Sequence, residues 1–114
     1  MRVSAEYKTA VLEHVGARPA YLEKKFDLAM KISLNLGHAF LTTQNAIEFI
    51  ATCEDYGSTV TDSIAIGAVY AAGLLRKGNQ RKTQEEVADA AKCSPKRVNH
   101  GYKRLEQILG VNFK

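Results

Sequence analysis

The chain has 114 residues, which is long enough for a single domain to bury its own core without metal or disulfide crosslinks. Its two cysteines, Cys53 and Cys93, match no metal-ligand spacing and no disulfide framework, so we expect a reduced, intracellular protein without a cofactor. The longest apolar run, from Ile64 to Leu75, is shorter than the ~18 residues that cross a bilayer, and we expect no membrane partner.

The net charge of +4 conceals a division along the chain. Residues 1–75 carry 6 Lys and Arg against 8 Asp and Glu, whereas residues 76–114 carry 10 against 4. The C-terminal third is therefore strongly basic, and the sequence favours an anionic partner for it.

Apolar residues recur at helical spacing throughout, and no stretch alternates as a strand does, so the sequence predicts an all-α fold. A first helix is predicted over 4–15, with Ser4 as its N-cap and Gly16 at its end. A second, amphipathic helix is predicted from Ala20 to about Leu36.

Two further helices follow in the first two thirds of the chain. One is predicted to begin with Thr42 or Thr43 as its N-cap. The other, over 60–75, is apolar on all sides and rich in small residues, which indicates a central helix wrapped by its neighbours. Thr61 or Asp62 is the expected cap of this central helix.

A basic turn at 76–82 leads into two short helices predicted within 83–109. Thr83 and the glutamate three residues later have the spacing of a capping box, which starts the first helix. Ser94 followed by proline starts the second, because serine caps well and proline is favoured at the first helical position. The connection is as short as a helix-turn-helix requires. It contains Lys92 where many such turns have a glycine, at a cost of about 1 kcal/mol if the residue is left-handed.

The second of these helices separates apolar from polar side chains, since successive residues lie about 100° apart. Its apolar side chains fall on one side: Val98, Tyr102, Leu105 and Leu109. The opposite side and its flanks carry Lys96, Arg97, Asn99, His100, Lys103, Arg104 and Gln107. Such a strip of cations and hydrogen-bonding groups is typical of a helix that enters a DNA groove.

If this helix enters a major groove, its N-terminal residues should meet base edges and its later residues should meet phosphates. The expected base-reading group is Ser94, Lys96, Arg97, Asn99 and His100. Arginine can make a bidentate contact to guanine, and asparagine one to adenine. The expected phosphate contacts are Arg81, Lys82, Lys103 and Arg104.

The sequence contains no nucleophile–base pair, Gly-rich phosphate loop or metal constellation, so we predict neither an enzyme nor a small-molecule substrate. The carboxylates of Glu85, Glu86 and Asp89 are interpreted as partners of a helix N-terminus. Two alternatives stay open. The basic strip could be an ordinary solvated helix face, or the domain could be a protein-interaction adaptor that uses its acidic first half and binds no DNA.

An alanine-rich helix, a basic turn and two short helices follow one another as SIAIGAVYAAGLL, RKTQEEVADAA and SPKRVNHGYKRL. This order resembles the cyclin-box repeat of archaeal transcription factor B and eukaryotic transcription factor IIB. The resemblance is clearest over 62–109 and extends back to about Phe26. It implies a cyclin-box-like five-helix domain over 20–114, with the helix-turn-helix at 83–109 and an extra N-terminal helix within 1–19.

The resemblance also implies a function and partners. In that family the domain docks double-stranded promoter DNA, with TATA-binding protein and RNA polymerase as further partners. It implies a location in the cytoplasm, beside the nucleoid, for an archaeal protein, or in the nucleus for a eukaryotic one. The sequence contains neither the zinc ribbon nor the second cyclin box of the family, so it corresponds to a single repeat.

Overall fold

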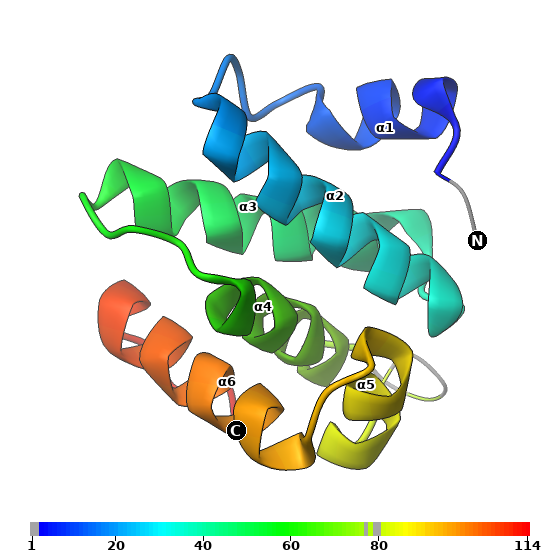
Figure 1. Cartoon of the computed structure of the whole chain (residues 1–114), viewed down its shortest axis with the longest axis vertical. Coiled ribbons are helices and arrows are strands. Elements are labelled where there is room, and N and C mark those ends of the chain that lie inside the picture. The colour runs from blue at the N-terminus through cyan, green and yellow to red at the C-terminus, as the bar shows by residue number, and fades with distance from the viewer. Residues whose placement is uncertain (1–2, 77, 79–80) are drawn as a thin grey trace.

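The computed structural model describes residues 3–76, 78 and 81–114. These residues form six helices and no strand, which confirms the predicted all-α fold (Figure 1). The helices are α1 (Ala5–Leu12), α2 (Ala20–Asn35), α3 (Phe40–Asp55), α4 (Asp62–Leu74), α5 (Gln84–Ala91) and α6 (Pro95–Leu109). No described helix is both long and apolar enough to cross a membrane.

Helix α4 is the centre of the molecule, as its sequence predicts. Every residue from Ile64 to Leu74 is buried, and α4 packs against α2, α3, α5 and α6. In Figure 1, α1, α2 and α3 lie on one side of α4, and α5 and α6 lie on the other. The Thr61 hydroxyl caps α4 by accepting a hydrogen bond from the N–H of Ile64 at 3.2 Å. The small side chains along α4 allow all four neighbours to approach closely.

Two glycines let α4 and α6 cross with their backbones in contact. A Cβ atom built on Gly67 of α4 would overlap the backbone of Tyr102, and one built on Gly101 of α6 would overlap the carbonyl oxygen of Ser63. Neither position has room for a side chain, so glycine is required there for steric rather than conformational reasons. This crossing fixes the position of α6 on the rest of the domain.

The N-terminal segment packs on the side of the domain that is remote from α6 (Figure 1). Val11 of α1 is fully buried in the core, and the ring of Tyr7 meets that of Phe40 edge to face at 6.1 Å between centroids. The ammonium group of Lys8 lies 2.9 Å from a carboxylate oxygen of Asp27. Helix α1, within the predicted extension over 1–19, therefore shares the hydrophobic core of the other helices.

The prediction that Thr42 or Thr43 caps the third helix is wrong. Helix α3 begins at Phe40, its N-cap is Ala39, and both threonines are buried inside its first turn. The Thr43 hydroxyl donates to the carbonyl of Ala39 at 3.2 Å, so it is satisfied within the helix and needs no capping role.

The first helix is also shorter than the predicted range 4–15. Helix α1 ends at Leu12, and residues 13–15 form a turn before Gly16, whose φ is 73°. The predicted cap is confirmed, because the Ser4 hydroxyl accepts from the N–H of Tyr7 at 3.2 Å. Within the basic turn predicted at 76–82, residues 77, 79 and 80 lie outside the described residues.

Candidate nucleic-acid interface

Helices α5 and α6 are joined by a connection of three residues, and α5 begins with a complete capping box. The Thr83 hydroxyl accepts from the N–H of Glu86 at 3.1 Å, and the Glu86 carboxylate accepts from the N–H of Thr83 at 3.0 Å. The hydrogen bond from the Thr83 backbone lowers the pKa of Glu86. This glutamate is therefore engaged at the start of α5, as the sequence predicts.

The turn between α5 and α6 has the conformation expected of a tight connection. Lys92 has φ 57° and ψ 48°, the left-handed region that favours glycine, so the predicted cost of about 1 kcal/mol applies. The Ser94 hydroxyl then caps α6 by accepting from the N–H of Arg97 at 3.2 Å, and Pro95 occupies the first turn. Ser94 is therefore a structural cap in addition to a predicted base contact.

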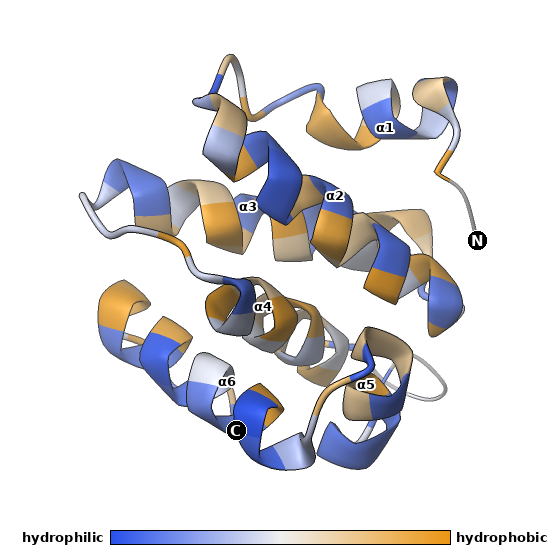
Figure 2. Cartoon of the chain, in the orientation of Figure 1, coloured by the Kyte–Doolittle hydropathy of each residue, from blue (hydrophilic) through white to orange (hydrophobic). Residues whose placement is uncertain are grey.

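Helix α6 separates its two faces as predicted. Val98, Tyr102 and Leu105 are buried, and Leu109 is half-buried against the core. The opposite face is exposed, and we call it the α6 strip: Lys96, Arg97, His100, Lys103, Arg104 and Gln107. In Figure 2 the edge of α5 and α6 that points away from α4 has hydrophilic colours. The strip is on the opposite side of the molecule from α1, which does not cover it.

The cations of the two parts of the chain differ in their partners. In the N-terminal part Lys8 pairs with Asp27, Arg18 with Glu54 and Asp55, and Lys25 with Asp62. Among the described residues, no lysine or arginine from 76 to 114 lies within ion-pair distance of a carboxylate. The charge of the C-terminal third is therefore left available to an external anion.

Two predicted base-reading residues are held by neighbouring helices. The Nε of Arg97 donates to the hydroxyl of Ser63 in α4 at 3.1 Å. The side-chain amide of Gln84 in α5 donates to the Oδ1 of Asn99 at 3.0 Å, and Asn99 is half-buried between the two helices. Sequence reasoning did not identify Ser63 or Gln84, because both contacts depend on how separate helices pack.

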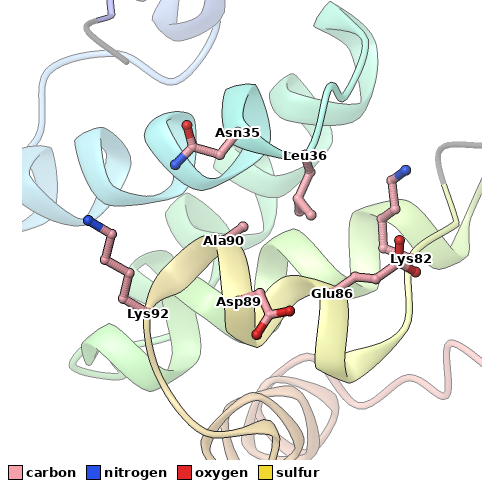
Figure 3. Close-up of a pocket in the computed structure, with 7 residues that line it drawn as sticks. All are labelled: Asn35, Leu36, Lys82, Glu86, Asp89, Ala90 and Lys92. Carbon is pink, nitrogen blue, oxygen red and sulfur yellow. The ribbon is translucent and has the colours of Figure 1, made fainter.

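Lys82 lies apart from the α6 strip. It lines one end of a surface hollow of about 550 Å³ between the C-terminal end of α2 and α5. Figure 3 shows Lys82 and Lys92 at opposite ends of this hollow, with Glu86 and Asp89 of α5 between them. Arg81, by contrast, is exposed. Of the predicted phosphate contacts, the structure brings Lys103 and Arg104 onto the strip and places Lys82 beside α2.

The described residues contain no group of three or more His, Cys, Asp or Glu side chains that could hold a metal ion. Burial raises the pKa of the Cys93 thiol in the turn and raises that of Cys53 to about 11, so both cysteines are held in the thiol form at neutral pH. What the α6 strip offers chemically is positive charge, hydrogen-bond donors and a preformed helix end.

The comparisons with known proteins find a similarity to a transcription initiation factor. No family model matches the chain, and no solved structure matches it. The chain is 31% identical over 90 residues to a transcription initiation factor IIB from Sulfurisphaera tokodaii, an alignment that covers 76% of this chain and 29% of that protein. The chain thus spans less than a third of this curated relative. The resemblance to transcription factor IIB is confirmed at this level, while the correspondence to one cyclin repeat stays a prediction.

Proposed function

We propose that this chain is a DNA-binding module of the transcription factor IIB type, which docks double-stranded promoter DNA through α5 and α6. The observation that carries the proposal is the α6 strip, whose cations are exposed and have no carboxylate partner among the described residues. Phosphates are the anions that such a strip meets when a helix lies in a groove. The similarity to an initiation factor supports the same conclusion.

Within this proposal the residues divide by their place on the helix-turn-helix. The N-terminal half of α6 supplies the groups that face base edges: Ser94, Lys96, Arg97, Asn99 and His100. The later residues and the preceding loop meet phosphates: Arg81, Lys82, Lys103 and Arg104. Lys82 would have to turn away from the α2–α5 hollow to do so, so we expect it to contribute least.

The wider assignments rest on the resemblance. We propose a cyclin-box-like domain over 20–114, preceded by a helical extension over 1–19, with TATA-binding protein and RNA polymerase as partners on the promoter. Because the extension lies on the opposite side of α4 from α6, it leaves the DNA-binding side open (Figure 1).

A salt titration tests the DNA-binding proposal. Affinity for a fluorescently labelled duplex is measured by anisotropy at several salt concentrations, for the wild type and for Lys103→Ala. Each lost phosphate contact should reduce the slope of log affinity against log salt by about 1.

The matched control is Lys24→Ala, because Lys24 is equally exposed but lies on α2, across the molecule from α6. This control should leave the slope unchanged. Affinity that is insensitive to salt, or equal slopes for Lys103→Ala and the wild type, would contradict the proposal.

A second candidate, a protein-interaction adaptor, is favoured by one apolar patch. Tyr56, Leu75 and Val111 are 63%, 51% and 48% exposed, and they line a hollow of about 470 Å³ together with Phe49 and Phe113. Exposed apolar patches of this kind occur at protein interfaces. An adaptor that bound its partner here would be unaffected by Lys103→Ala, whereas Tyr56→Ser would weaken it.

A further inference from the structure

Among the described residues that lie outside 83–109, Ser63 is the one whose side chain forms a hydrogen bond with the α6 strip. It lies in the first turn of α4, and its hydroxyl accepts the hydrogen bond from the Nε of Arg97 at 3.1 Å. Arg97 remains exposed, so the contact holds the base of the guanidinium group while its end faces solvent.

The backbone at the helix crossing fixes Ser63 in this position. The carbonyl of Ser63 is the group that a side chain on Gly101 would overlap. Arg97 precedes Gly101 by four residues, so it lies one turn before Gly101, at the edge of the α6 strip that borders α4. The close approach of the two helices therefore brings the Ser63 hydroxyl within reach of Arg97, and the crossing fixes the backbone that carries it.

The N–H donors that Arg97 leaves unoccupied match the hydrogen-bonding edge of one DNA base. A guanidinium group carries five N–H donors, and the hydrogen bond to Ser63 uses only the one on Nε. The four donors on the two terminal nitrogens have no partner among residues 3–76, 78 and 81–114, and they form the planar fork that matches O6 and N7 of guanine. Lys103 has no hydrogen-bond partner among the described side chains, and its ammonium group, a point charge on a flexible stem, suits phosphate instead.

We infer that Ser63 is a positioning residue that aims the terminal nitrogens of Arg97 at a guanine edge in the major groove. The inference rests on the proposed DNA-binding function and extends it to base selection by a helix outside the helix-turn-helix. Holding Arg97 before DNA arrives reduces the side-chain entropy that is lost on binding. The hydroxyl of Ser63 should therefore affect discrimination between bases more than it affects affinity for DNA in general.

The test is a binding selection from a pool of duplexes with randomised central base pairs, followed by sequencing. The proteins compared are the wild type, Ser63→Ala, Ser63→Thr, Arg97→Ala and Thr9→Ala. Wild type and Ser63→Thr should enrich guanine at one position, and Arg97→Ala should lose that enrichment. Ser63→Ala should reduce it by roughly 2- to 10-fold at the same position, the value of one hydrogen bond. Its affinity for unselected duplexes should stay unchanged.

Thr9→Ala is the matched control, because it also removes a hydroxyl with a hydrogen bond, to the Ala5 carbonyl at 2.9 Å, but in α1, on the opposite side of α4 from α6. It should keep the guanine preference. Thermal unfolding of each variant checks that Ser63→Ala remains folded.

Four outcomes would overturn the inference. Guanine enrichment by Ser63→Ala equal to that of the wild type would show that the hydroxyl has no role, and DNA binding itself would stand. If Ser63→Thr lost as much guanine enrichment as Ser63→Ala, the effect would come from the helix crossing instead of the hydroxyl. Equal binding of all duplexes by the wild type would exclude base selection by Arg97, and with it the inference. Wild-type protein that binds no duplex would refute both the proposed function and the inference.

Discussion

At the scale of single residues, burial determines the chemistry of the histidine in the α2–α3 connection. His38 is only 6% exposed, and neither nitrogen of its imidazole has a hydrogen-bond partner in the described part of the chain. Burial and, to a smaller extent, the charge of Lys82 lower the pKa of His38 to about 4. The folded protein therefore holds this side chain neutral at pH values where an exposed histidine takes up a proton.

This difference predicts a pH dependence of the free energy of unfolding. The unfolded chain protonates His38 near pH 6.5 and the folded chain near pH 4, so the unfolded state binds more protons between these values. Stability should be complete above about pH 6.5 and should fall by up to about 3 kcal/mol as the pH approaches 4. Urea unfolding of the wild type and of His38→Leu at several pH values checks this. If the free energy of unfolding fell equally with decreasing pH in the wild type and in His38→Leu, His38 would be excluded as the cause.

At the scale of helices, the crossing of α4 and α6 positions the candidate interface. Aromatic contacts in the core hold α6 on the rest of the domain. Tyr102 packs edge to face on Tyr70 of α4 at 5.0 Å between ring centroids. Phe113 of the C-terminal segment lies against Phe49 of α3 at 5.1 Å between ring centroids. Because the backbones touch at Gly67 and Gly101, a small displacement of α6 would move the whole α6 strip relative to α4.

Substitution of Gly101 by alanine should therefore destabilise the protein, although alanine is the better helix former. The added methyl group meets the rigid backbone of Ser63 instead of a flexible side chain, so we expect a loss of roughly 2–3 kcal/mol. Gln107→Ala, on the exposed face of the same helix, should change stability by less than about 0.5 kcal/mol. Urea denaturation midpoints measure both, and equal midpoints would show that the helices do not need this close contact.

At the scale of the whole molecule, the sequence predicts what is local. The capping box at Thr83, the cap at Ser94 and the central place of α4 follow from residue types at fixed spacings, and the structure confirms them. The caps proposed at Thr42 and Thr43 are wrong because a threonine hydroxyl is satisfied equally well inside a helix. No local sequence pattern distinguishes a threonine that caps a helix from one that lies inside the first turn.

The parts of the site that were not predicted depend on contacts between distant segments. Gly101 carries no sign in its own neighbourhood that it meets α4, and Ser63 gives no indication that it reaches Arg97. The periodicity of α6 identifies which side chains are exposed, but the angle at which it crosses α4 decides which of them are held. The structure was therefore needed to show which side chains of the candidate interface form hydrogen bonds with other helices.

The central claim is that α6 presents a DNA-binding face, and an NMR titration tests it most directly. Backbone amide shifts of the full chain are followed as unlabelled duplex DNA is added. The account predicts that the largest changes fall in α6 and the turn before it, from Ser94 to Arg104, while the amides of α1 and α2 stay unchanged. Changes concentrated in residues 20–60, or no changes at a saturating concentration of duplex, would contradict it.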